Sequence, residues 1–124
     1  DRLAKYKRVH VRVSIKGASE DEFHTLTGAH RSAYTLAYQA LEHLIERRVS
    51  CNACLMASFS DSKGVKEVRR RLAAIAPGIL HSLEIERIKQ FPKVRERLKK
   101  YELTANRGMS CSPADVIATD GGAA

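Results

Sequence analysis

The chain has 124 residues, of which 29% are charged and 44% hydrophobic, and this composition predicts one globular domain with an aliphatic core. Lysine and arginine number 22 against 14 aspartates and glutamates, so the net charge of +8 favours a polyanionic partner. No apolar run approaches the roughly 20 residues that span a bilayer, and no signal-peptide core is visible. We therefore expect a cytoplasmic protein with no membrane partner.

The three cysteines are Cys51, Cys54 and Cys111, and their odd number argues against a secreted disulfide framework. Cys51 and Cys54 form a C-x-x-C pair, but a zinc site needs four ligands and no second pair stands at a suitable spacing. The pair also does not open a helix, as a thioredoxin-like redox pair would. We interpret both as small apolar strand residues and expect neither a metal nor a cofactor.

Residues 8–15 alternate strictly between polar and apolar side chains, a period of two that predicts a β-strand. A basic arm of residues 1–7 precedes the strand. The core face of the strand would carry four aliphatic residues, Val9, Val11, Val13 and Ile15. The outward face would carry Arg8, His10, Arg12 and Ser14, which are rich in hydrogen-bond donors.

Two helices are predicted after this strand. Ser19 is a candidate N-cap, and Glu22 completes a capping box with it. Gly28 is expected at the C′ position, where the first helix ends. A longer helix then begins at Ser32 and continues to about residue 48, with apolar residues at helical spacing.

A similar order follows in the second half. Residues 52–60 form a weaker predicted strand, whose outward residues would be Cys54, Met56, Ser58 and Ser60. A helix capped by Asp61 or Ser62 ends at Pro77-Gly78. Another helix is predicted from Ser82, with an interruption at Pro92 and a continuation to residue 103. Residues 104–124 lack an amphipathic period and are predicted to be a polar, extended or disordered tail.

The repeated order of strand, helix and helix predicts an α+β fold that is mainly helical. Its two β-α-α units, residues 8–48 and 52–103, would share a two-stranded antiparallel ribbon. One chain would thus form a pseudo-dimeric ribbon-helix-helix domain, and we expect it to be monomeric because both units lie within it.

Such a ribbon fits the major groove of duplex DNA. Arg12 would contact guanine, and the N-terminus of each unit's second helix would bind a phosphate. Only the first strand carries arginines on its outward face, so we expect modest sequence specificity. We expect phosphate contacts to supply the affinity. The predicted DNA-binding residues are Lys5, Lys7, Arg8, His10, Arg12, Ser14, Lys16, Arg31, Ser32, Cys54, Met56, Ser58, Ser60, His81 and Ser82.

The order of elements, the basic outward strand and Arg31-Ser32 at the start of the second helix resemble ribbon-helix-helix DNA-binding proteins. Residues 8–101 are most similar to single-chain members that assist transfer of plasmid DNA to plant cells. The resemblance implies a bacterial protein that binds DNA near a transfer border, with a ParA-like ATPase and a relaxase complex as partners. Cys54 and Met56 depart from the polar pattern of this fold, which weakens expected base readout by the second strand.

Two other interpretations remain open. Gly28-x-x-Arg31-x-x-Tyr34-Thr35-x-Ala37 after a basic strand resembles the N-terminus of transposon-associated RNA-guided nucleases, whose carboxylate-bearing nuclease domain is not in this sequence. A basic adaptor that docks on an acidic protein is the other. The sequence holds no Ser/His/Asp order, glycine-rich phosphate loop or HExxH motif, so we do not predict an enzyme.

Overall fold

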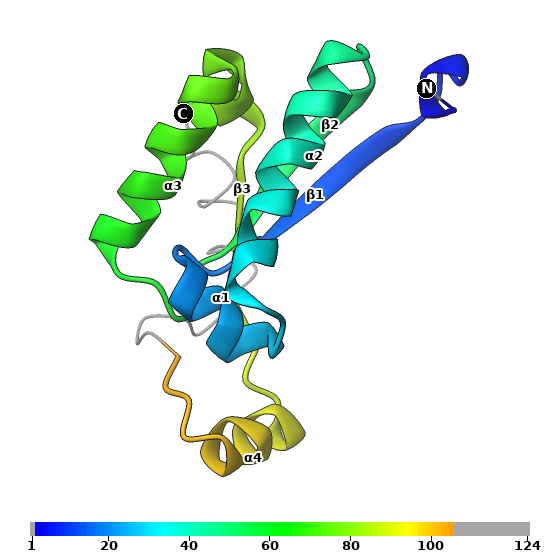
Figure 1. Cartoon of the computed structure of the whole chain (residues 1–124). Helices are drawn as coiled ribbons and strands as arrows, with labels where there is room; N and C mark the ends of the chain where they lie inside the picture. Colours follow the sequence, from blue (N-terminus) through cyan, green and yellow to red (C-terminus); the bar gives the residue numbers. More distant parts are fainter. Residues whose placement is uncertain (1, 106–124) are drawn as a thin grey trace.

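The computed structural model describes residues 2–105, which contain a three-stranded sheet in the order β1-β2-β3 (Figure 1). The strands are β1 (His10–Lys16), β2 (Ser50–Met56) and β3 (Glu84–Glu86). Both pairings are parallel, with His10 opposite Ser50 and Cys54 opposite Glu84. The predicted antiparallel ribbon is therefore wrong.

Helices make the crossovers between these strands. The α-helices are α1 (Glu20–Thr27), α2 (Thr35–Glu46), α3 (Ser62–Ile75) and α4 (Pro92–Lys100). Short 3-10 helices are η1 (Leu3–Lys5), η2 (Arg31–Tyr34) and η3 (Pro77–Ser82). The segment between β1 and β2 holds two helices and is long enough to return the chain to the same end of the sheet, which makes parallel pairing possible.

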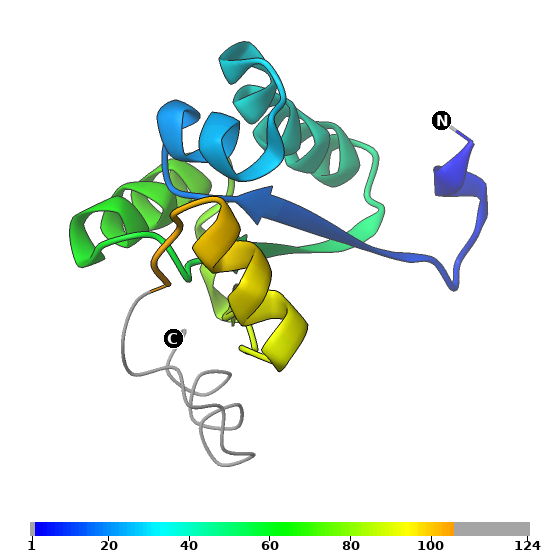
Figure 2. The ribbon, with the colours of Figure 1, turned by 90° about the horizontal axis from the view of Figure 1, so that it is seen from below.

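The hydrophobic core lies between one face of the sheet and helices α1, α2 and α3. Aliphatic residues of the strands and helices form one buried cluster there, including Ile15, Leu41, Leu55, Val68 and Leu72. In the view of Figure 2, α1 and α2 lie on one side of β1, and α4 lies on the other. No residue of α4 is buried. The fold is therefore a parallel α/β layer with α4 outside its main core.

The second half of the chain differs from the predicted β-α-α unit. Strand β2 begins at Ser50, and its four central residues are all buried, as expected for a central strand of a parallel sheet. The helix predicted from Ser82 is replaced by β3, in which Glu84 and Glu86 flank Ile85. A helical period was predicted from the apolar residues Leu83, Ile85, Ile88 and Phe91. The alternation over residues 83–86 instead suits a strand.

Local signals at the helix ends were more reliable. Ser19 Oγ accepts a hydrogen bond from Glu22 N at 3.1 Å, and Gly28 ends α1 with a positive φ of 71°, as predicted. Asp61 caps α3 through Gly64 N at 2.6 Å. Ser32 is not the N-cap of α2, because η2 precedes that helix and α2 begins at Thr35.

Side-chain hydrogen bonds join the loops at the carboxyl ends of the strands. The Glu22 carboxylate accepts from Ala18 N at 3.2 Å and from Ser60 Oγ at 2.6 Å, linking the loops after β1 and β2. Ser58 Oγ accepts from Ile88 N at 2.6 Å and links the loop after β2 to the segment after β3. This end of the sheet is therefore cross-linked by partly buried polar contacts.

Gly64 brings α3 close to the loop after β1. A Cβ at this position would lie 2.9 Å from Ala18 Cβ, closer than two such atoms approach in proteins. We expect Gly64→Ala to destabilise the chain by about 1 kcal/mol, because overpacking outweighs the gain in helix propensity. Urea unfolding measures this change. Gly78→Ala is the control, since nothing lies within 4 Å of its added Cβ; equal stability of the two variants would contradict the packing described.

Candidate ligand-binding site

The face of the sheet away from the core helices carries polar and charged side chains on all three strands. Because strand residues alternate between faces, this polar face comprises His10, Arg12, Ser14 and Lys16 on β1, Ser50, Asn52, Cys54 and Met56 on β2, and Glu84 and Glu86 on β3. Parallel sheets normally have both faces covered. Within residues 2–105, helices α1, α2 and α3 pack on one face only, so the polar face is the candidate site.

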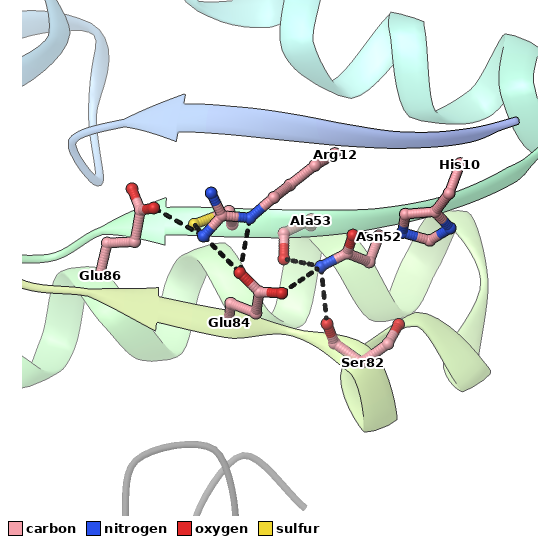
Figure 3. Close-up of polar contacts among 8 residues, drawn as sticks. His10, Arg12, Asn52, Ala53, Ser82, Glu84 and Glu86 are labelled. Atoms are coloured by element: carbon pink, nitrogen blue, oxygen red, sulfur yellow. Dashed lines mark hydrogen bonds and ion pairs between the residues drawn. The ribbon is translucent and has the colours of Figure 1, made fainter. Parts of the chain in front are cut away.

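Arg12 occupies the middle of the polar face and reaches across β2 to two glutamates of β3 (Figure 3). Its Nε donates to Glu84 Oε2 at 2.6 Å, and its Nη2 donates to Glu86 Oε1 at 2.6 Å and also pairs with Glu84. The same Nη2 donates to Cys54 Sγ at 3.2 Å. One guanidinium group thus joins all three strands and holds two carboxylates side by side.

Asn52 continues this network toward the amino ends of the strands (Figure 3). Its Nδ2 donates to Glu84 Oε1 and to Ser82 O, both at 3.2 Å. Its Oδ1 lies 2.7 Å from His10 Nε2, and His10 Nδ1 lies 2.7 Å from Ser50 Oγ. Hydrogen bonds therefore connect Ser50 at one end of the face to Glu86 at the other.

Cys54 and Asn52 form the floor of the polar face, because Cys54 is fully buried and Asn52 is 5% exposed. Burial is the main reason why the pKa of the Cys54 thiol is raised to about 12, and hydrogen bonding to Glu86 acts in the same direction. Cys54 is thus a neutral thiol at physiological pH. It can donate a hydrogen bond to Glu86, but it is not a thiolate nucleophile.

The charged groups above this floor remain accessible. The side chains of Arg12, Glu84 and Glu86 are 49%, 40% and 33% exposed. Burial raises the pKa of Glu86, but hydrogen bonds with Cys54 and Arg12 and the positive charge of Arg12 outweigh it, so the pKa lies below its ordinary value. Glu86 is therefore stabilised as an anion beside Arg12.

The residues predicted for DNA binding on the first strand do share a face. His10, Arg12 and Ser14 are on the polar face, as predicted, whereas Lys16, expected in a turn, is the last residue of β1 on the same face. Arg8, expected on the strand, lies with Lys5 and Lys7 in the preceding arm, where all three are exposed. Arg12, however, is occupied by two glutamates. While both contacts persist, the guanidinium group of Arg12 is not available to donate two hydrogen bonds to a guanine base.

The remaining predicted residues are not brought together. Cys54, Ser58 and Ser60 are buried, and Met56 is half-buried, so as placed they offer little contact to a nucleic acid. Arg31 pairs with Asp21 at 2.6 Å. Arg31 and Ser32 precede α2 near the carboxyl ends of the strands, whereas His81 and Ser82 precede β3 at its amino end (Figure 1). The two expected phosphate contacts thus lie at opposite ends of the sheet.

Sequence reasoning missed Asn52, Glu84 and Glu86, which provide most of the polar contacts to β1. A signal for the two glutamates existed. Leu83-Glu84-Ile85-Glu86 alternates with a period of two, as half-buried strands do. No comparable signal marked Asn52, because its role depends on parallel pairing with β1.

Comparison with known proteins gave no match to any family model, curated protein or solved structure. Over residues 2–105, no helix is long and apolar enough to cross a membrane. The same part of the chain contains no group of three or more His, Cys, Asp or Glu side chains arranged to hold a metal ion. The site must therefore be interpreted from its own geometry.

Proposed function

We propose that the polar sheet face is the ligand-binding surface of an α/β protein and that it binds a small charged molecule. The observation that carries this proposal is the convergence of Arg12, Asn52, Glu84 and Glu86 on one face of a parallel sheet whose other face is covered by helices. Parallel α/β sheets bind ligands near the carboxyl ends of their strands.

The site combines a fixed floor with exchangeable charges. Asn52 and Cys54 are buried and hydrogen-bonded. By contrast, the Arg12 ion pairs are partly exposed, and such pairs contribute only about 0–1 kcal/mol each. A ligand carboxylate or phosphate can therefore replace a glutamate on Arg12 at little cost, while a ligand cation can bind the released carboxylate.

The positions of the neighbouring groups support the same chemistry. Lys16 lies on the polar face beyond Ser14 at the carboxyl end of β1, and its charge contributes to the lowered pKa of Glu86. The loops at this end are joined through Glu22 and Ser58. A charged ligand would thus meet two cations and two carboxylates on a rigid support.

Thermal unfolding with glutamate, arginine and ATP as three separate probes tests this function. At about 100 times its dissociation constant, a bound probe stabilises the fold by about 2.7 kcal/mol, a shift of several degrees. Arg12→Met should abolish the shift, while the control Lys66→Gln, at an exposed position on α3, should retain it. No shift with any probe, or an equal shift in Arg12→Met, would contradict the proposal.

Duplex DNA binding is the second candidate, supported by the distribution of cations rather than by the sheet. Residues 2–8 contain four lysines or arginines and no acidic residue, and residues 87–100 contain seven and a single glutamate. None of these cations forms an ion pair within the described residues 2–105. Action in plasmid DNA transfer, with a ParA-like ATPase and a relaxase, stays a prediction that depends on this candidate.

Salt dependence measures the number of DNA phosphates contacted. If Lys5, Lys7 and Arg8 each neutralise one phosphate, the triple glutamine variant should reduce the slope of log K against log salt by roughly 2.7. Fluorescence anisotropy with a labelled duplex gives this slope. Arg70→Gln is the control, because Arg70 already pairs with Glu67 at 2.5 Å. An unchanged slope in the triple variant would remove the arm from the interface.

A further inference from the structure

At the amino end of the polar face, hydrogen bonds join the side chains of Ser50, His10 and Asn52, and none of these bonds involves Arg12. Ser50 lies opposite His10 in the parallel register, and Ser50 Oγ is 2.7 Å from His10 Nδ1. On the other side of the ring, His10 Nε2 is 2.7 Å from Asn52 Oδ1. The imidazole thus lies between a hydroxyl group and an amide group.

The amide of Asn52 has a defined orientation. Its Nδ2 donates to Ser82 O and to Glu84 Oε1, and both of these atoms are acceptors. The amide oxygen must therefore face His10, and because this oxygen can only accept, Nε2 carries the proton in the neutral ring. Nδ1 then has a lone pair, and the Ser50 hydroxyl donates to it. This is the arrangement in which a histidine acts as general base on a serine.

We propose that Ser50 is a nucleophile, activated by His10, that accepts the acyl group of activated carboxylic esters. Ser50 Oγ attacks the ester carbonyl carbon while its proton moves to His10 Nδ1. The resulting imidazolium keeps its Nε2–H bond to Asn52 Oδ1. When the tetrahedral intermediate collapses, the bond to the leaving alkoxide breaks, and the alkoxide takes the proton from Nδ1. The products are a Ser50 ester, an alcohol and a neutral His10.

The exposure of the three residues suits this role. Ser50 and His10 are exposed, so an ester can reach the hydroxyl group, whereas Asn52 is buried and is a positioning residue that holds the ring. General base assistance accelerates such reactions by roughly 10²–10⁴-fold. The contacts in residues 2–105 supply this base but no group that positions a hydrolytic water. We therefore expect stoichiometric acylation of Ser50 rather than rapid turnover.

The full chain treated with p-nitrophenyl acetate tests this site. Release of p-nitrophenolate gives the rate, and peptide fragmentation by mass spectrometry locates the acyl group. We expect about one rapid equivalent per chain, placed on Ser50. Ser50→Ala should lose it, and His10→Gln should slow it by at least about 10²-fold. Ser62→Ala is the control, because Ser62 is an exposed serine at the start of α3, outside the polar face, and it should react like the parent chain.

Further measurements separate catalysis from simple exposure. Asn52→Leu should slow Ser50 acylation, because it removes the amide that holds the His10 ring in place. Unfolding curves should show that His10→Gln remains folded. Acylation of Ser50 at an unchanged rate in folded His10→Gln, or acylation elsewhere only, would overturn the proposal. Arg12→Met should keep Ser50 acylation even where it loses the probe response, so this proposal and the proposed function can fail separately.

Discussion

Replacement of Cys54 by arginine should destabilise the fold by roughly 1–3 kcal/mol, because it forces a much larger side chain into a fully buried position that already contacts Arg12. The neighbouring Ser14→Arg is the matched control. Ser14 lies opposite Cys54 in the parallel register, but its side chain is exposed, so we expect a change within about 0.5 kcal/mol.

Urea unfolding of both variants gives the two free energies. The comparison separates the observed sheet from the predicted ribbon, in which Ser14 and Cys54 were both outward residues. If Cys54→Arg were as stable as Ser14→Arg, Cys54 would not be the buried floor of the polar face.

Replacement of Arg12 by methionine should destabilise the chain by about 1–2 kcal/mol at neutral pH. Methionine keeps an apolar side chain of similar reach, but two partly exposed ion pairs are lost. Glu84 and Glu86 are also left as neighbouring carboxylates on β3, and their repulsion adds to the loss. Replacing both glutamates by glutamine in the same variant should recover part of the stability.

The stability difference between the parent chain and Arg12→Met should depend on pH through the carboxylate of Glu86. The folded pKa of Glu86 lies below its ordinary value of 4.5, so its stabilising contribution is fully present above that value and disappears as pH falls through the folded pKa. In Arg12→Met the carboxylate loses its cationic partner. We expect the difference in unfolding free energy between parent and variant to shrink as the pH is lowered below about 4.5. A constant difference would contradict coupling between Arg12 and Glu86.

Local sequence signals predicted helix ends and the first strand, because these features depend on nearby residues. The Ser19 cap, the Gly28 helix end and the alternation over residues 8–15, most of which lies in β1, were all recognisable. Strand direction depended instead on how residues 17–49 return the chain, which no local period reports. Once β2 was paired antiparallel in the prediction, its burial, its partners and the role of residues 82–86 were also misjudged.

The candidate site was predictable only in part, for the same reason. His10 and Arg12 were recognised on one basic face, but their partners come from strands 40 to 74 residues away. The positive charge suggested a polyanion, although Arg12 is neutralised within the sheet. A site built from three parallel strands can be predicted only when the register of the strands is known. This register places Arg12 opposite Asn52 and Cys54 opposite Glu84.

Amide chemical-shift mapping by NMR tests the central claim most directly. The isotope-labelled chain is titrated with the probe that gives the largest thermal stabilisation. We predict that the largest changes fall on residues 12–16, 54–56 and 84–86, where the polar face approaches the carboxyl ends of the strands. Changes confined to residues 2–8 and 92–100 would contradict a ligand site on the sheet and leave the basic arm and α4 as the binding surface.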